Sequence, residues 1–410
     1  MHIAEKKKIV LLGMMTPIPV GGVVWQNIHY LIGLQRLGFD VYYVEQHSRS
    51  PSMFMETEQC DGTGRAVAFI AAVMNRFDLG DRWCYQALHD DGRFFGLSET
   101  KLRELFESAE LIINLHGGTQ PLPEHAATGR LIYVGTDPVA LEIRLHNNVR
   151  STIDFLAPHV AFFTFAENLG NADCRLPVSE RFKFMPTRQP LVLDFWAESN
   201  SPGEHFTTVG NWHQNGRSVQ FDGRTYTWSK DVEFGKFIDL PRRTSQTFEL
   251  ALSNCPAEAQ QLLQQKGWRL RDAWEFSRDP EAYRSYIQNS RGEFTVAKEQ
   301  NVELRSGWFS DRSATYLAAG RPVITQETGF SNILPTGEGL FGFTESGEIL
   351  EAIAAINGDY EKHARAAREV ARGYFSHELV LGRLLESVGS SARPAVASVR
   401  ASDTQPTARL

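Results

Sequence analysis

Residues 307–330 read GWFSDRSATYLAAGRPVITQETGF, and they predict a helix, a stop and a strand in close succession. The alanines and the leucine of ATYLAA would form one apolar face of a short helix. Gly320 suits the end of a helix, and the proline two residues later prevents its continuation. The apolar residues 322–325 then predict a buried strand. This order of elements is typical of a parallel α/β sheet.

Four polar residues stand at the start of that helix: Ser310, Asp311, Arg312 and Ser313. One explanation is N-capping, because Ser and Asp side chains accept hydrogen bonds from the unpaired amides of the first turn. The other is an anion site, because the same amides and the helix dipole favour a phosphate. Capping does not explain Arg312, whose charge is unfavourable there unless an anion or a carboxylate compensates it. The four residues are therefore candidate phosphate ligands.

Strand and helix signals alternate through the rest of the chain. A helix lies between the expected strands 9–14 and 39–44, which makes a βαβ unit and implies a parallel sheet. The other expected strands are 111–115, 131–134 and 161–165 in the first half and 206–210, 294–297 and 322–325 in the second. Asp279 and Pro280 predict a helix start, and Asp222-Gly223 predicts a hairpin turn within an inserted β-ribbon.

The chain of 410 residues is too long for one ordinary core. We expect a Rossmann-like domain over 1–190, a second over 191–388 and a disordered tail over 389–410. The fold class is thus α/β, with two Rossmann-like domains facing each other across a cleft. Ligands of open α/β sheets bind beyond the carboxyl ends of the strands, so the cleft would be lined from both sides.

Composition excludes several classes of function. Hydrophobic residues make up 42% and charged residues 22%, as in globular proteins, and the formal charge of −7 argues against a general nucleic-acid surface. The four cysteines form no CxxC pair, so zinc is not expected, and a reduced cytoplasmic chain is the simplest interpretation. No HExxH motif and no DxD at a strand end occurs, so metal-dependent sugar transfer is not expected either. No run of eighteen apolar residues occurs, so we expect no integral membrane segment.

Two catalytic candidates follow expected strands directly. His116 comes after LIINL and precedes two glycines that leave space around it, and an imidazole can take a proton near neutral pH or hold a sugar hydroxyl. Asp137 follows the next strand in VGTDP. It is a rival base or an orienting carboxylate, although Asp also suits a turn before proline.

Other candidates line the same predicted edges. Gly21 and Gly22 follow the first strand and could admit a phosphate or an acceptor beside helix amides, or they could simply make a turn. Glu167 and Asn168 follow the strand AFFTF and could contact acceptor or donor. Trp212 follows the first strand of the second half, where it could stack on a base or a sugar or pack in the core.

The helix, the junction AAGRPV and the loop ETGF resemble the nucleotide-sugar-binding region of the GT-B glycosyltransferases. The string WFSDRSATYLAAGRPV resembles a bacterial subgroup of that fold. The resemblance covers residues 190–385 well and the first half by topology. The family pattern has two glutamates, which would fall on Gly307 and Thr315, and neither position is acidic here.

The resemblance implies a nucleotide-diphosphate sugar as donor, with no other cofactor. Arg312 would bind the diphosphate through its guanidinium, and Asp311 would bind hydroxyls of the ribose or sugar or orient Arg312. Two lysines could add charge at the diphosphate: Lys298, after the strand FTVA, which could equally be solvated, and Lys230. The loop residues Glu327, Thr328 and Gly329 could contact the donor, or Glu327 could be an exposed loop residue.

The sequence therefore predicts a cytoplasmic, metal-independent hexosyl- or pentosyltransferase that acts on a small-molecule or glycan acceptor. His116 or Asp137 would be the base if the anomeric configuration inverts, and His116 would orient the sugar if it is retained. A nucleotide-sugar epimerase on the same fold is an alternative. Because the two glutamates are missing, a non-catalytic nucleotide-sugar-binding protein is another.

Overall fold

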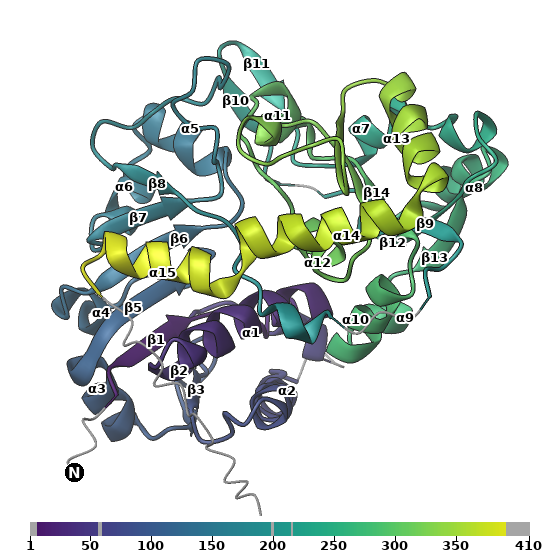
Figure 1. Ribbon diagram of the computed structural model, residues 1–410. Coiled ribbons are helices and arrows are strands. Elements are labelled where there is room, and N and C mark those ends of the chain that lie inside the picture. The colour runs from purple at the N-terminus through teal and green to yellow at the C-terminus, as the bar shows by residue number, and fades with distance from the viewer. Residues whose placement is uncertain (1–5, 56–59, 198–200, 215, 391–410) are drawn as a thin grey trace, which may run out of the picture.

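Two largely parallel sheets organise the protein, each covered by helices (Figure 1). The computed structural model describes residues 6–55, 60–197, 201–214 and 216–390. The tail predicted for 389–410 lies outside the described residues, apart from positions 389 and 390.

The first sheet has eight strands in the order β4-β3-β2-β1-β5-β6-β7-β8. Its neighbours are parallel except for β3 and β4, which are antiparallel. The strands are β1 Lys8–Leu12, β2 Asp40–Glu45, β3 Trp83–Gln86, β4 Phe94–Gly96, β5 Ala109–Leu115, β6 Leu131–Gly135, β7 Ala161–Thr164 and β8 Phe184–Pro186.

The second sheet has six parallel strands in the order β13-β12-β9-β14-β15-β16. The strands are β9 His205–Asn211, β12 Thr247–Ser253, β13 Arg269–Asp272, β14 Gly292–Thr295, β15 Val323–Gln326 and β16 Leu340–Phe343. The order reverses at β9 and β14, as it does at β1 and β5 of the first sheet. This doubly wound order is that of Rossmann folds, so the predicted pair of Rossmann-like sheets is confirmed.

The helices of the first half are α1 Gly21–Arg36, α2 Thr63–Arg76, α3 Glu99–Ser108, α4 Pro123–Ala127, α5 Ala140–His146 and α6 Arg150–Leu156. Those of the second half are α7 Asp231–Lys236, α8 Ala257–Gln265, α9 Trp274–Ser277, α10 Pro280–Gln288, α11 Glu299–Glu303, α12 Asp311–Ala318, α13 Ser346–Gly358, α14 Tyr360–Val370 and α15 His377–Ser387. No helix of the described residues is long and apolar enough to cross a membrane.

Local sequence signals set several element boundaries as expected. Asp279 caps α10, since its carboxylate accepts hydrogen bonds from the amides of Glu281 and Ala282 at 2.8 Å. Asp222 and Gly223 both have positive φ angles and join β10 Val219–Phe221 to β11 Arg224–Tyr226 in an antiparallel hairpin. The inserted ribbon is therefore confirmed.

The chain passes between the two halves twice, and the two crossings lie side by side at Leu191 and Ser376. The amide of Leu191 donates to the carbonyl of Phe375, and the amide of His377 donates back to the carbonyl of Leu191 at 2.9 Å. Beyond this point α15 packs against α1, so the end of the described chain returns to the first half (Figure 1). The strands of the two sheets fall within the two predicted segments, and the boundary at residue 190 stays a prediction.

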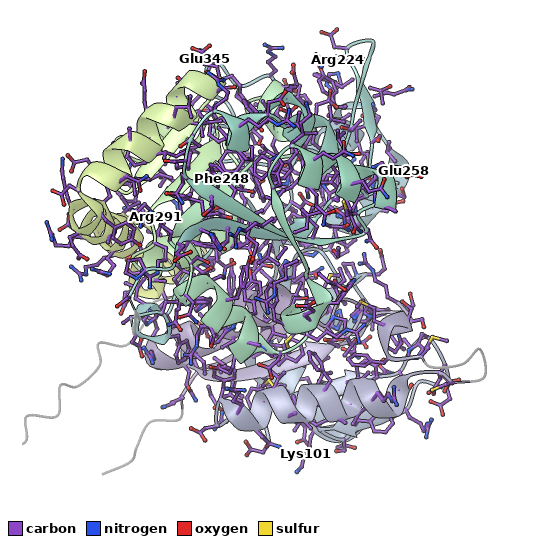
Figure 2. All side chains as sticks on the ribbon, turned by 90° about the vertical axis from the view of Figure 1, so that its right-hand side faces the viewer. Lys101, Arg224, Phe248, Glu258, Arg291 and Glu345 are labelled. Carbon is purple, nitrogen blue, oxygen red and sulfur yellow. The ribbon has the colours of Figure 1, made fainter. Side chains whose placement is uncertain are left out.

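The core of the second half is rich in aromatic rings. Phe248 of β12 lies inside it, with its ring 5.3 Å from that of Trp268 and 5.5 Å from that of Phe294 (Figure 2). These rings fix the sheet that carries the carboxyl-end loops after β9 and β14. The packing thus places those loops on a rigid base.

Candidate active site

The carboxyl ends of the two sheets meet at the places where each strand order reverses. His116 follows β5 at the reversal in the first sheet, and Lys298 follows β14 shortly beyond the reversal in the second. Asp137 follows β6, one strand further along. Such reversal points are where ligands of open α/β sheets bind, because the loops on either side diverge there.

An ion pair joins the two halves at this edge. The Nζ of Lys298 lies 3.0 Å and 3.1 Å from the two carboxylate oxygens of Asp137, whose side chain is 26% exposed, against 13% for the lysine. Arg217 also contacts this carboxylate, at 3.3 Å. Burial lowers the pKa of Lys298, and the charge of Asp137 opposes that shift. One carboxylate thus serves two cations, which leaves the cluster positive.

Aromatic rings surround the same cations. The Nζ of Lys298 lies 3.5 Å from the ring centroid of Trp228, and the guanidinium carbon of Arg217 lies 4.3 Å from it. The indole nitrogen of Trp308 donates to the carbonyl of Thr136 at 3.1 Å. This bond ties the loop before α12 to the loop after β6. Cation–π contacts and this cross-link hold the cationic side chains in defined positions.

One ring nitrogen of His116 has a hydrogen-bond partner among the described residues, and the other has none. Its Nδ1 lies 2.9 Å from the hydroxyl of Thr136, while its Nε2 is buried with no hydrogen-bond partner among the described residues. Burial lowers the pKa of His116 to about 4, with Asp137 raising it and Arg49 lowering it further. The imidazole is therefore neutral near pH 7, and its backbone has a φ of 62°. In the tautomer whose Nδ1 donates to Thr136, Nε2 is the basic nitrogen and can accept a proton.

The loop that carries Asp137 is strained. Val139 has φ 92° and ψ −61°, a conformation that a β-branched residue rarely adopts. Its amide donates to the buried carboxylate of Glu142 at 2.7 Å, and the hydroxyl of Thr164 donates to the same side chain at 3.2 Å. Strain of this kind persists where the surroundings enforce it, and it gathers at functional sites. The strained turn holds Asp137 at the sheet edge.

The N-terminus of α12 faces that of α1. Gly22, Tyr283, Asp311 and Arg312 line a narrow crevice between them. No side chain of the described residues caps α12 at Ser310. The hydroxyl of Ser313 is buried and has no partner in the part of the chain that the structure describes. The capping explanation for Ser310 is therefore not realised, whereas the carboxylate of Asp311 accepts hydrogen bonds from amides at the start of α12.

A buried carboxylate compensates Arg312. The Nε of Arg312 lies 2.6 Å from the carboxylate of Glu293 in β14. The Nη1 of Arg312 donates to the carbonyl of Val209 at 2.6 Å, and its Nη2 donates to the hydroxyl of Thr295 at 3.1 Å. The positive charge at the helix start is thus explained by Glu293. The contact of Arg312 with a diphosphate stays a prediction, as does the role of Asp311, whose pKa is raised by burial.

Lys230 lies next to Arg312. The Nζ of Lys230 donates to the hydroxyl of Thr295 at 3.2 Å, and Arg312 contacts that same hydroxyl. Burial lowers the pKa of Lys230 well below its usual range, and the charge of Arg312 adds to the shift. The charge of Glu293 opposes that shift, so one buried carboxylate acts on both cations.

The loop after β15 is held by contacts within the protein. The amide of Gly329 donates to Glu327 at 2.5 Å, and the hydroxyl of Thr328 donates to the carbonyl of Trp308 at 2.7 Å. Asn168 of the first half closes over Gly329, and its Nδ2 donates to the carbonyl of Arg305 at 2.9 Å. Asn168 therefore acts as a bridge between the halves, and donor contacts of the loop stay a prediction.

Two other candidates lie in different surroundings. Glu167 forms an ion pair with Arg188 at 2.5 Å, and burial raises the pKa of this glutamate. Trp212 stacks on Phe234 at 5.6 Å and belongs to the core of the second half. The geometry thus supports core packing for Trp212, rather than stacking on a base or a sugar.

Sequence reasoning missed Arg217, Trp228 and Glu293. Arg217 and Trp228 lie on either side of the ribbon hairpin, and a cation and an aromatic in an insertion carry no periodic signal. Glu293 stands directly before the expected strand 294–297, and the observed strand β14 begins earlier, at Gly292, so this glutamate lies inside the buried strand. Within the described residues no three His, Cys, Asp or Glu side chains gather as metal ligands.

Comparison with known proteins supports the fold. No family model and no curated protein matches the chain. Among solved structures, HepE of Anabaena in complex with UDP-glucose superposes with a TM-score of 0.52 at 13% identity, over 94% of this chain and 100% of that one. Sucrose-phosphate synthase from Thermosynechococcus elongatus gives 0.51 at 14% identity, over 94% and 99%.

An alpha-glucosyltransferase in complex with UDP and a 13-mer DNA gives a TM-score of 0.53 at 10% identity, over 94% of this chain and 100% of that one. These matches span nearly the whole of both chains in each case. The protein therefore has the GT-B fold, as the resemblance of residues 307–330 predicted.

Proposed function

We propose that the protein is a glycosyltransferase that moves a sugar from a nucleotide-diphosphate sugar to an acceptor hydroxyl in the cytoplasm, without a metal ion or further cofactor. The observation that carries the proposal is the meeting of His116, Asp137 and Lys298 across the two sheet edges. Solved neighbours of the same fold hold UDP or UDP-glucose, which favours a nucleotide donor here as well. The four free cysteines suit a reducing compartment.

The donor diphosphate would lie against the cations of the second half. Lys298, Arg217 and Lys230 would supply positive charge. Asp137 now lies where a phosphate oxygen could contact Lys298, so donor binding would exchange one anionic partner for another. As the bond between the sugar and the diphosphate breaks, the leaving group takes the electron pair, and these cations stabilise its growing charge.

His116 would act on the acceptor. Its free Nε2 would take the proton of the acceptor hydroxyl while the oxygen bonds to the anomeric carbon. Asp137 raises the pKa of His116, so it would stabilise the imidazolium that forms. If the configuration is retained, the same nitrogen would orient a sugar hydroxyl instead.

Release of nucleoside diphosphate from a panel of hexose and pentose donors tests the proposal, with acceptors supplied and with EDTA present. We expect acceptor-dependent release by the wild type that EDTA does not change. His116→Ala should lower turnover at least a hundredfold while donor affinity stays. Near-normal turnover would move the base role to Asp137.

Other products of the same assay identify the alternatives. An epimerised donor formed without acceptor would indicate an epimerase. Saturable donor binding with no product from any acceptor would indicate a non-catalytic binding protein. Either result would contradict sugar transfer.

A further inference from the structure

A second cavity lies in the first half, away from the Asp137–Lys298 pair. It has a volume of about 620 Å³, within the range of small-molecule sites, and lies between α3, α4 and the edge strands β3 and β4. Phe94, Leu102 and Phe106 form its apolar wall. The ring of Phe106 is held edge-on by His125 at 4.9 Å. None of its lining residues belongs to the crevice at α12.

A chain of hydrogen bonds fixes the side-chain amides of Gln46 and Gln86 in the cavity wall. The amide of Leu122 donates to Nδ1 of His125 at 3.2 Å, so Nε2 carries the proton and donates to Gln46 at 2.9 Å. Gln46 donates to Gln86 at 2.8 Å, and Gln86 donates to the carbonyl of Gly92 at 3.3 Å. Each amide uses one of its two N–H groups in this chain. Both side chains are therefore preorganised for a ligand.

The charges around the cavity do not suit a phosphate. They are three carboxylates and two guanidinium groups: Glu99, Glu107, Glu124, Arg103 and Arg130. None of the five forms an ion pair in the described part of the chain. The Nε of Arg130 is buried and has no hydrogen-bond partner among residues 6–55, 60–197, 201–214 and 216–390. An acidic excess here contrasts with the cationic cluster at Lys298 and argues against a nucleotide.

Nearly all of the polar groups are planar, as amides, carboxylates or guanidinium groups, and two aromatic rings accompany them. Planar groups offer paired donors or acceptors at a fixed spacing, which suits neighbouring hydroxyls. Aromatic rings suit the apolar face of a ring that carries those hydroxyls. We infer that this cavity is a second site, separate from the Asp137–Lys298 pair, and that it binds a neutral carbohydrate.

The cavity also has a structural connection to the donor side. Gln46 follows Glu45, whose buried carboxylate accepts a hydrogen bond from the amide of Thr16 at 3.0 Å. Thr16 belongs to the loop between β1 and α1, which leads to Gly21 and Gly22 at the α12 crevice. A carbohydrate in the cavity would therefore lie on the same strand-end framework as the donor.

Saturation-transfer NMR of the full chain with maltotriose, cellotriose and triacetylchitotriose tests the inference. We expect at least one to bind, with affinity falling at least tenfold in Phe94→Ala and in Arg103→Ala. Lys101→Ala is the matched control, because Lys101 is exposed on α3, two residues before Arg103, but does not line the cavity, and it should bind as the wild type does. Arg103 is exposed as well, so its variant should fold normally.

Titration of UDP in parallel separates the two hypotheses. Unchanged UDP binding together with no response to any of the three sugars would overturn the carbohydrate site and leave the proposed function standing. Sugar binding that persists in both cavity variants would also overturn it. Sugar binding that depends on Phe94 and Arg103, without UDP binding, would support the cavity and contradict the donor site.

Discussion

At the scale of single residues, Glu293 and Arg312 form the most consequential buried pair. Glu293 is fully buried in β14, and its Oε1 lies 2.6 Å from Arg312. A buried carboxylate that loses its partner carries an uncompensated charge in a medium of low polarity. The pair therefore fixes the start of α12 relative to the second sheet.

Replacing Arg312 by Ala should lower the free energy of unfolding by about 3–5 kcal/mol, because it strands the charge of Glu293. Urea unfolding followed by circular dichroism measures the loss. In the double variant Arg312→Ala/Glu293→Gln the loss should be smaller, since the stranded charge is gone. A double variant as unstable as the two single losses added together would contradict the pairing.

At the scale of elements, the ribbon β10–β11 links the two halves. Val219 and Tyr226 of the ribbon pack with Val139 and Ile143 around α5 in one buried cluster. The ring of Phe221 also meets that of His146 at 5.5 Å. The ribbon thus carries Arg217 and Trp228 to the mouth of the site by packing on the opposite half.

Tyr226→Ala should destabilise the protein by about 3 kcal/mol, because it empties a buried aromatic position in this cluster. Thr225→Ala, at the neighbouring exposed position, should cost less than about 0.5 kcal/mol. Thermal unfolding of both variants beside the wild type compares them. Equal losses would show that the ribbon does not depend on its buried face.

The elements show which features the sequence could reveal. Apolar runs predicted β5, β6 and β14, so His116, Asp137 and Lys298 could be placed at strand ends from periodicity alone. The pairing of Asp137 with Lys298 could not, because it joins residues 161 positions apart through the docking of two sheets. Capping by Ser310 does not occur, and the partner of the adjacent Arg312 is Glu293, a long-range contact that local sequence signals could not reveal.

At the scale of the whole molecule, buried histidines link stability to acidity. Burial lowers the pKa of His125 and His159 to about 4, and that of His29 to about 3, from an ordinary value of 6.5. The unfolded chain therefore binds protons between pH 6.5 and pH 4 that the folded chain does not. Each of these histidines lowers stability as the pH falls through this window and has little effect above it.

His125→Gln should reduce that acid sensitivity. From the two pKa values of His125, the wild type should lose about 2 kcal/mol through this residue between pH 7 and pH 5. Denaturant unfolding of wild type and variant at both pH values gives the difference. The variant is expected to start less stable at pH 7, and its further loss at pH 5 should be smaller. An equal further loss would mean that His125 is not buried in its neutral form.

The central claim is that a nucleoside diphosphate binds where Lys298 meets Asp137. Isothermal titration of UDP, GDP and ADP into the wild type, Lys298→Ala and Lys266→Ala tests it most directly. Lys266 is the control, because it pairs with Asp239 at 2.8 Å on the surface of the second half. At least one nucleotide should bind the wild type and Lys266→Ala equally and bind Lys298→Ala more weakly by about 1.5–3 kcal/mol. Binding of none of the three, or equal binding by all three proteins, would contradict the account.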